Sequence, residues 1–523
     1  MPPASTITTT TQTTAISFPF QRKAFYANGR FWVFYCDGDY MLWAHSLDGI
    51  TWTVAQKTIE TRSPTQTSGT WSNPTGAYAD GGGVAQAYVG DQQDYYGYGF
   101  ALSSTAKVTK VRVRLDIFSD VAGNVSIKVS WDGGTTWGPV HTQAITTTET
   151  TYFIDVTSDT EWTPTKTSNI VVRITAVDTE IVNLDWIPVE VTYYDPDQVV
   201  RASTLGEKIS IWFDGTFLHY AYASKVANTA LTYRRSTPNS DGTITWSAPE
   251  QTAVAAVAGV TYSRPFISVD SVGYPWISYA TGSYPFVTKA STNDGSWTTQ
   301  TDFPTQLSTT SNAAWATSVV PLTSQKMYVV YVYSAVTLKG RLWDGSVFGS
   351  EEAASVSAIL SYFRFSVTTY QDDVHLVFDK NVATYDIIYR KRTFGVGWGS
   401  EEVIQTPGNV NYAPVLSTFG PGDLYCFWMG APTSERVYYK RNIGGTWDST
   451  PTLWITEVVI EPNDRLTCFY QAYGSHPTFY IGLVYIPETS SPYSIKFDFI
   501  TLTKKEIQYS DGLVSVDVIS YET

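Results

Sequence analysis

The sequence predicts an all-β protein built from repeats of about fifty residues. Two observations predict this class. First, 15% of the 523 residues are aromatic and only 16% are charged, and aromatic and β-branched residues favour strands over helices. Second, the short segment Ser46–Trp52, with the sequence SLDGITW, returns along the chain at an almost fixed interval.

The interval is visible in the aromatic residue that closes each copy of this segment. After Trp52, the closing aromatics are Trp246, Trp297, Phe348, Trp398 and Trp447, so successive steps from Trp246 onward are 51, 51, 50 and 49 residues. A period near fifty is typical of radial or stacked repeats. The step from Trp52 to Trp246 is 194 residues, which predicts an insertion of about 140 residues after the first repeat.

Each copy has the chemistry of a hairpin turn. Its Asp can accept backbone N–H bonds, its Gly supplies a positive φ, and its aromatic side chain can pack between neighbouring sheets. The segment resembles the Asp box, the bacterial neuraminidase repeat of sialidase-like β-propellers, over about 380 residues outside the insertion. The resemblance implies a β-propeller, for which we expect seven blades, or six if the last sheet is an appendage. Asp boxes are structural in that family, so they imply a fold more than an activity.

The organisation that we expect has five parts. A Thr-rich flexible arm spans 1–17, the first blade 18–61, an inserted domain 62–197, the remaining blades 198–503, and a C-terminal strand or tail 504–523. The insertion has short alternating strands that predict a two-sheet β-sandwich, a jelly roll. It also contains an out-of-period Asp box at Ser130–Trp137, which we interpret as the same turn in a different sheet.

Composition and charge exclude several classes of function. A net charge of −14 disfavours a general nucleic-acid binder. No apolar run is long enough for a membrane helix, and the N-terminal stretch lacks the pattern of a secretory signal. The three cysteines, Cys36, Cys426 and Cys468, are expected to be buried and unbridged. An aromatic, Thr-rich and Lys-poor surface without an export signal predicts an extracellular or virion-surface location.

Five of the predicted blades place a cation near the start of the inner strand. In sialidases an arginine cluster in that region clamps the substrate carboxylate, so the resemblance implies an anion site at the mouth of the central channel. The alternative is that these cations neutralise carboxylates or cap strand ends. The five residues are Arg22, Lys208, Arg264, Arg364 and Arg465.

Catalytic residues of the sialidase type are poorly represented. Asp37 and Asp39 lie in the turn CDGDY, on the loop where the resemblance would place an acid/base Asp. However, Gln21–Lys23 replaces the Arg-Ile-Pro signature of the family, and no Tyr/Glu nucleophile pair stands out. An Asp-Gly-Asp turn is more often structural than catalytic.

The insertion offers two further candidate sites. Tyr95 and Tyr96 could stack on sugar rings, or pack between the sheets of the sandwich. Asp80, Asp91 and Asp94 could hold a structural Ca²⁺ through oxygen ligands, and no other cofactor is expected.

The function predicted is therefore a non-enzymatic binding or structural protein. We expect it on a virion, of a phage or an archaeal virus, as a tail, fibre or capsid-surface component that contacts glycans, other subunits or further copies of itself. The alternative is a sialidase-like glycoside hydrolase that acts on acidic glycans, with Arg22, Arg264 and Arg364 as the anion clamp.

Overall fold

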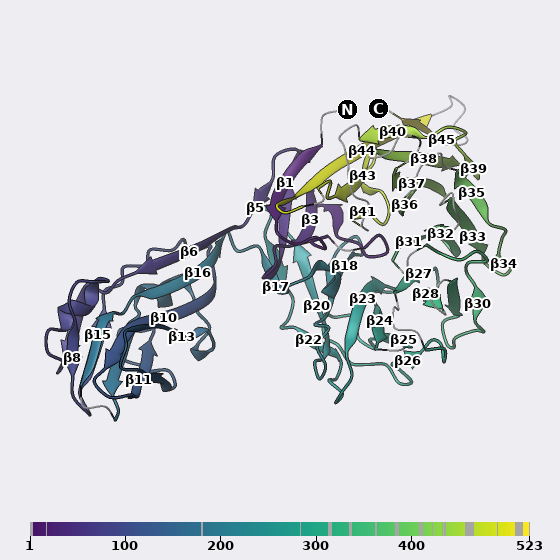
Figure 1. The fold of residues 1–523 in the computed structure, drawn as a ribbon. Coiled ribbons are helices and arrows are strands. Elements are labelled where there is room, and N and C mark those ends of the chain that lie inside the picture. The colour runs from purple at the N-terminus through teal and green to yellow at the C-terminus, as the bar shows by residue number, and fades with distance from the viewer. Residues whose placement is uncertain are drawn as a thin grey trace. The chain divides into compact units, whose positions relative to one another are not determined.

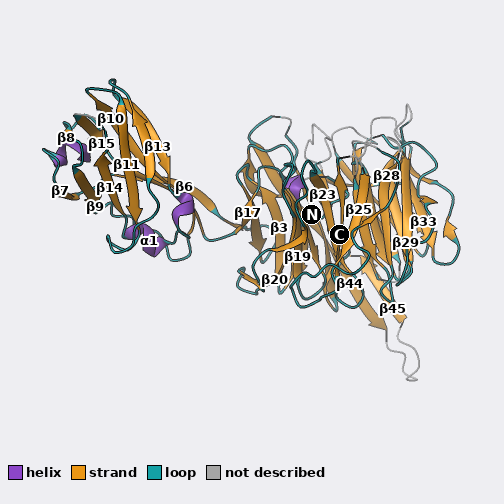
Figure 2. Cartoon of the chain, turned by 90° about the horizontal axis from the view of Figure 1, so that it is seen from below, coloured by secondary structure: helices purple, strands orange, loops and turns teal. Residues whose placement is uncertain are grey.

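The computed structural model describes residues 4–16, 18–178, 181–282, 284–311, 316–333, 337–360, 363–381, 386–406, 412–420, 422–430, 432, 436–455, 465–488, 490–507 and 516–521. The chain divides into two compact units, Met1–Val54 with Val200–Thr523, and Ala55–Val199. Figure 2 shows that strands make up both units and that helices are confined to short segments. Within the described residues no helix is both long and apolar enough to cross a membrane.

The larger unit is a ring of antiparallel sheets. Its described residues form seven sheets, and Figure 1 shows them standing around a common centre, which is the arrangement of a β-propeller. We call it the propeller unit. The strand of each sheet nearest the centre is, in chain order, β2 (Ala24–Ala27), β18 (Ile209–Phe213), β23 (Tyr262–Val269), β27 (Thr317–Pro321), β31 (Phe365–Tyr370), β36 (Tyr412–Phe419) or β41 (Leu466–Cys468).

Each inner strand is followed outward by a second and a third strand. The second strands are β3 (Arg30–Cys36), β19 (Leu218–Ala223), β24 (Pro275–Thr281), β28 (Met327–Tyr333), β32 (Asp373–Asp379), β37 (Asp423–Met429) and β43 (Thr478–Tyr485). The third strands are β4 (Tyr40–Ser46), β20 (Leu231–Pro238), β25 (Tyr284–Lys289), β29 (Thr337–Trp343), β33 (Ile387–Thr393), β38 (Val437–Ile443) and β44 (Tyr493–Ile507).

Short outer strands complete the sheets. They are β5 (Thr53–Val54), β17 (Val199–Ala202), β21 (Ile244–Trp246), β22 (Gln251–Val254), β26 (Thr305–Gln306), β30 (Glu352–Ala353), β34 (Gly397–Trp398), β35 (Glu402–Gln405), β39 (Thr446–Trp447) and β40 (Thr452–Ile455). The turn η3 (Gly206–Lys208) precedes β18, β42 (Tyr473–Ser475) pairs with β43, and β45 (Val516–Tyr521) pairs with β44.

The N-terminal arm is not the flexible segment that its composition suggested. Ser5–Thr10 forms strand β1, which pairs antiparallel with β44 in register from Ser5 opposite Phe497 to Thr10 opposite Tyr493. The β-branched threonines suit an extended strand, and the side chains of Ile7 and Thr10 on this strand are buried. The first strand of the chain therefore completes the sheet made by the last strands, which closes the ring from both ends.

The first sheet is interrupted by the smaller unit. In this sheet the short strand β5 pairs with one part of β4, and β17 takes the edge place beside β4. Strand β6 (Gln56–Arg62) instead pairs along its whole length with β16 (Val189–Asp195) in the smaller unit.

The smaller unit, which we call the insert unit, is a sandwich of two sheets. One sheet has the order β6, β16, β10 (Lys107–Ser119), β15 (Val182–Trp186) and β8 (Ala85–Ala87), with β13 (Thr150–Asp155) also on β10. The other has the order β12 (His141–Ile145), β11 (Gly123–Ser130), β14 (Val171–Ala176), β9 (Gln92–Tyr96) and β7 (Gln66–Gly69). Alternate residues of both sheets face a shared apolar core. Short turns are η1 (Pro74–Tyr78), η2 (Thr157–Asp159) and α1 (Pro164–Ser168).

The Asp-box turns have the predicted local geometry. Asp48 Oδ1 accepts the backbone N–H groups of Ile50 and Thr51 at 2.8 and 2.7 Å, and Gly49 has a φ of 72°. Those hydrogen bonds lower the pKa of Asp48 to about 2. In five turns the closing aromatic then packs on an aromatic ring of the preceding sheet: Trp52 on Phe497, Trp297 on Tyr233, Phe348 on Phe303, Trp398 on Tyr328 and Trp447 on Tyr389.

Candidate functional site

A short segment between β1 and β2 fills the centre of the ring. All six residues from Phe18 to Lys23 are buried. The rings of Phe18 and Phe363 stack with centroids 4.1 Å apart, and those of Phe20 and Phe365 with centroids 5.5 Å apart. We call residues 18–23 the plug segment. Because it enters the centre from outside the repeat, the fifty-residue pattern gave no sign of it.

Arg22 is the centre of the plug segment. Its Nη2 donates hydrogen bonds to Ser366 Oγ at 2.9 Å and to the carbonyl oxygens of Val367 and Leu416, each at 3.0 Å. Its Nη1 lies 3.2 Å from Cys468 Sγ. These partners belong to β31, β36 and β41, so one guanidinium joins three inner strands at the axis.

Each of the other four predicted cations also has a protein partner. The anion clamp expected from these residues stays a prediction. Lys208 Nζ donates to Thr204 Oγ1 at 2.8 Å, and burial lowers the pKa of this amine. Arg465 Nη1 donates to a backbone carbonyl at 2.6 Å. The remaining pairs are Arg264 with Glu207 at 3.7 Å and Arg364 with Asp379 at 3.8 Å.

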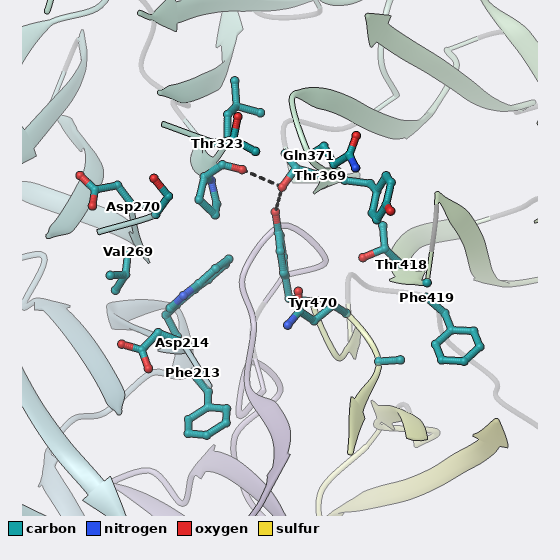
Figure 3. Close-up of a pocket in the computed structure, with 18 of the residues that line it drawn as sticks. Phe213, Asp214, Val269, Asp270, Thr323, Thr369, Gln371, Thr418, Phe419 and Tyr470 are labelled. Carbon is teal, nitrogen blue, oxygen red and sulfur yellow. Dashed lines mark hydrogen bonds between the residues drawn. The ribbon is translucent and has the colours of Figure 1, made fainter. Parts of the chain in front are cut away.

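A cavity of about 590 Å³ opens at the end of the axis where the inner strands turn into the second strands. Figure 3 shows its lining residues converging from several sheets around the axis. They come from the ends of inner strands β18, β23, β27, β31 and β36 and from the segment that follows β41. They include Trp212, Phe213, Asp214, Asp270, Ser271, Thr323, Tyr370, Gln371, Thr418, Phe419, Tyr470, Gln471 and Phe479.

Tyr470 and Trp212 form the floor of this cavity. Both are almost fully buried, and their ring centroids lie 4.4 Å apart. The Tyr470 hydroxyl lies 2.6 Å from Thr369 Oγ1, which itself donates to the Pro321 carbonyl at 2.8 Å (Figure 3). The Arg22 guanidinium lies behind the ring, 5.6 Å from its centroid. Burial raises the pKa of Tyr470 to about 12, so the phenol stays protonated at neutral pH.

The two carboxylates at the rim are engaged by their own turns. Asp214 accepts the backbone N–H of Phe217 at 2.7 Å and pairs with His219 Nε2 at 3.0 Å. Burial alone would raise the pKa of Asp214, but these hydrogen bonds outweigh it and the pKa lies below its usual value. Asp270 accepts backbone N–H groups of its turn and the Trp276 indole N–H at 3.2 Å. A general acid needs a raised pKa, so Asp214 is unsuited to that role.

The rest of the lining is neutral and rich in hydrogen-bonding groups. Hydroxyl, amide and aromatic side chains line the opening together with the aliphatic residues Val269, Pro321, Leu322 and Ala472, and no Lys or Arg is among the described lining residues. Such a surface can exchange hydrogen bonds with a polyhydroxylated ligand and offer ring faces to its C–H groups, but it has no counter-charge for an anion. These residues share one signal in the sequence, because they recur at the ends of the inner strands, whereas the predicted cations lie near the starts.

The cavity lies at the ends of the inner strands. The anion site was expected on the opposite face, near the starts of these strands. Strands alternate in direction, so the turns after the inner strands share a face with the Asp-box turns, as the 3.2 Å hydrogen bond from Asn293 Nδ2 to the Val272 carbonyl shows. Residues 312–315, 361–362, 407–411 and 456–464, which precede β27, β31, β36 and β41 in the sequence, lie outside the described residues.

The remaining predicted residues do not join this cavity. Asp37 Oδ1 accepts the backbone N–H groups of Asp39 and Tyr40 at 2.9 and 2.8 Å, which is the geometry of a structural turn. Tyr95 is fully buried in the sandwich core, so it offers no platform for a sugar. Tyr96, its neighbour, lines a separate groove of the insert unit.

The three candidate calcium ligands have other partners. Asp94 forms a two-pronged ion pair with Arg173, at 2.7 and 2.8 Å. Asp91 Oδ2 accepts the backbone N–H of Tyr88 at 2.9 Å, and Asp80 lies 3.9 Å from Arg114. Within the described part of the chain, no group of three or more His, Cys, Asp or Glu side chains could hold a metal ion.

Comparisons with known proteins give no family. No protein-family profile matches the chain, and no curated protein matches it in sequence. Among solved structures, AofleA from Arthrobotrys oligospora is similar at 11% identity and a TM-score of 0.37, with 60% of this chain and 85% of that chain covered. The six-bladed fucose-recognising Aleuria aurantia lectin is similar at 11% identity and a TM-score of 0.35, over 60% and 95% of the two chains. A protein of unknown function from Dyadobacter fermentans gives 10% identity and a TM-score of 0.38, over 56% and 93%.

Proposed function

We propose that this protein is a non-enzymatic carbohydrate-binding protein whose axial cavity takes an uncharged saccharide. The observation that carries the proposal is the lining: hydroxyl, amide and aromatic side chains surround the opening, while the two rim carboxylates already accept hydrogen bonds from their own turns. A volume of about 590 Å³ is within the range of small-molecule sites and would accept one or two sugar rings.

The rigidity of the floor supports binding. Tyr470 is held by Thr369 on one side and by the Arg22 guanidinium behind it, so a ligand would meet a surface that is already ordered. A preorganised site loses less conformational entropy on binding than a mobile one. The side chains of Gln471 and Gln371 are exposed at the rim and could reach ligand hydroxyl groups without disturbing that floor.

The alternative, hydrolysis of acidic glycans, is less well supported by the same residues. It would need a cation clamp and an acid/base pair. The predicted cations have backbone or carboxylate partners, the pKa of Asp214 lies below its usual value, and the pKa of Tyr470 is about 12. A general acid works best with a raised pKa, so the lowered pKa of Asp214 does not favour that role.

The virion location and the contact with other virion subunits are also proposals, and they rest on sequence composition alone. We expect the protein on the outer surface of a virus particle, where a glycan-binding propeller would contact a host. Immunogold electron microscopy of native particles is the test. Label confined to the inside of host cells, with none on particles, would contradict this location.

Saccharide binding is tested by calorimetry with the full chain and a panel of neutral mono- and disaccharides. We expect Tyr370→Ala and Gln471→Ala each to weaken binding by about fivefold, because each removes a contact worth roughly 1 kcal/mol. Tyr88→Ala, which truncates an exposed tyrosine of the insert unit, is the matched control and should bind as the unmodified chain does. The proposal fails if no neutral saccharide binds, or if both cavity variants bind normally. Turnover of fluorogenic sialosides or uronides would favour the hydrolase.

A further inference from the structure

The insert unit has its own groove, on the outer face of the sheet that contains β9 and β14. Its volume is about 410 Å³. The loop of the out-of-period Asp box covers one side of it, and the end of α1 borders another. The lining residues are Ser68, Asp94, Tyr96, Gly97, Gly133, Gly134, Trp137, Ser168, Asn169, Ile170, Val171 and Arg173.

The Asp box of the insert unit fixes the position of Trp137. Asp132 Oδ1 accepts the backbone N–H of Thr136 at 2.7 Å and the Ser130 hydroxyl at 2.8 Å. Ser130 Oγ in turn accepts the N–H of Gly134 at 2.9 Å, and Gly134 has a φ of 94°. In five such turns of the propeller unit the closing aromatic packs on a neighbouring sheet. Here the Trp137 indole lies against the Arg173 guanidinium, whose central carbon Cζ is 3.9 Å from the centroid of the indole ring. The indole is only partly buried.

Asp94 and Arg173 present a fixed polar pair in the groove. They face each other across β9 and β14 and form two parallel hydrogen bonds, at 2.7 and 2.8 Å. Their side chains keep 18% and 28% of their surface exposed. The hydrogen bonds that Arg173 donates to Asp94 raise the pKa of Arg173, and the carboxylate lies against the guanidinium as its counter-charge. The pair can still accept and donate hydrogen bonds on its open side.

An aromatic side chain lies beside this pair. Tyr96 follows Asp94 by two residues on β9, so both project from the same face of the sheet, while Tyr95 between them points into the core. Val171 is paired with Tyr96 across the sheet and is nearly buried in the groove. Two partly buried rings, Tyr96 and Trp137, therefore line one groove together with a neutral carboxylate–guanidinium pair.

We infer that this groove is a second saccharide site, which binds an uncharged sugar unit by stacking on Tyr96 and Trp137 and by hydrogen bonds to Asp94 and Arg173. An anionic ligand is disfavoured because Asp94 already neutralises the only described cation of the lining. A hydroxylated ring fits because it exchanges hydrogen bonds with both members of the pair and offers C–H groups to the aromatic rings. The inference does not rest on the axial cavity, which has no residue in common with the groove.

The test measures saccharide binding at the groove in a chain whose axial cavity carries two substitutions. Neutral oligosaccharides are first screened as an array with the full chain carrying Tyr370→Ala and Gln471→Ala, and binding of the selected sugar is then measured by calorimetry. We expect binding to persist in this background and to weaken by about tenfold or more with Trp137→Ala or Tyr96→Ala. Trp137→Phe should restore part of the affinity, because a smaller ring remains.

Phe153→Ala is the matched control. Phe153 also carries an arginine over its ring, Arg112 at 4.3 Å, but it lies on β13 in the other sheet. This variant should bind as its parent does, and circular dichroism should show that all variants are folded. The inference is overturned if the cavity substitutions alone abolish binding, which leaves the proposed function intact, or if Trp137→Ala and Tyr96→Ala both bind normally. Binding of peptides instead of sugars would overturn the ligand class.

Discussion

Buried histidines of the propeller unit are held neutral by their surroundings. His375 Nδ1 lies 2.9 Å from the Tyr389 hydroxyl, and burial lowers the pKa of the imidazole to about 4. Burial lowers the pKa of His45 to about 4 as well, with the nearby Arg30 contributing in the same direction. In both cases the folded protein takes up a proton less readily than an unfolded chain does.

This difference predicts a pH dependence of stability. A histidine with a lowered folded-state pKa contributes fully above the unfolded value of 6.5, and its contribution is lost as the pH falls from 6.5 towards 4. We therefore expect His375→Gln to lose less stability than the unmodified chain between about pH 7.5 and about pH 4.5. Urea unfolding at the two pH values measures the loss. His476→Gln, at an exposed position, should keep the original dependence. Equal losses in His375→Gln and the unmodified chain would contradict the prediction.

At the scale of elements, the plug segment gives a structural role to Gln21–Lys23, the residues that replace the Arg-Ile-Pro signature of sialidases. Gln21 Nε2 donates to the carbonyls of Glu207 and Pro265, at 3.1 and 2.9 Å, and Lys23 Nζ donates to the carbonyl of Ile209. Together with Arg22 these side chains supply donors to backbone oxygens at the centre of the ring. Such oxygens would otherwise be buried without partners, which costs free energy.

Replacement of Arg22 should therefore destabilise the fold strongly. Arg22→Met keeps much of the side-chain volume but removes the donors to Ser366, Val367 and Leu416. We expect a loss of about 3–5 kcal/mol in the free energy of unfolding, because three buried acceptors lose a charged donor and each lost partner costs roughly 1–3 kcal/mol. Chemical denaturation is the measurement. Arg30→Met, at a partly exposed arginine that donates to Ser240, should cost less than about 1 kcal/mol. A comparably small cost for Arg22→Met would show that the plug segment is not held as described.

On the scale of the whole molecule, the ring is closed by strands from both ends of the chain. The last sheet has the order β1, β44, β43, β41, so its outer strand comes from the N-terminal segment. Thr10 Oγ1 also donates to the Cys36 carbonyl at 3.0 Å, and Ser5 Oγ to the Gly49 carbonyl at 2.8 Å, which ties this strand to the first sheet. An incomplete last sheet would leave an open edge.

Removal of residues 2–11 should open this closure. Five residue pairs between β1 and β44 would be lost, and at roughly 0.5–1.5 kcal/mol for each net hydrogen bond we expect a loss of at least about 3 kcal/mol. Thermal unfolding of the truncated chain measures it. Removal of residues 516–523 is the control, because β45 pairs only with the far part of β44, beyond Thr501. The closure would be unimportant if the two truncations had equal effects.

Sequence patterns identified much of the fold because they report local chemistry. The spacing of the closing aromatics predicted the repeat, and the Asp and Gly of each turn predicted its hydrogen bonds and positive φ, as at Asp48 and Gly49. These features depend on residues a few positions apart. The candidate sites were harder to predict from the sequence. Tyr96 was predicted to stack on sugar rings, but its partners Trp137 and Arg173 were not.

The sequence by itself therefore determined an all-β chain of regular repeats with a long insertion, because turn chemistry and strand propensity act locally. Only the tertiary structure decided that the Thr-rich arm is a closing strand and that Arg22 belongs to a central plug. It also decided that the axial cavity lies where the inner strands end. Each of these features joins residues hundreds of positions apart, such as Arg22 and Leu416. Contacts of that kind depend on how the sheets close around the axis, which no local pattern encodes.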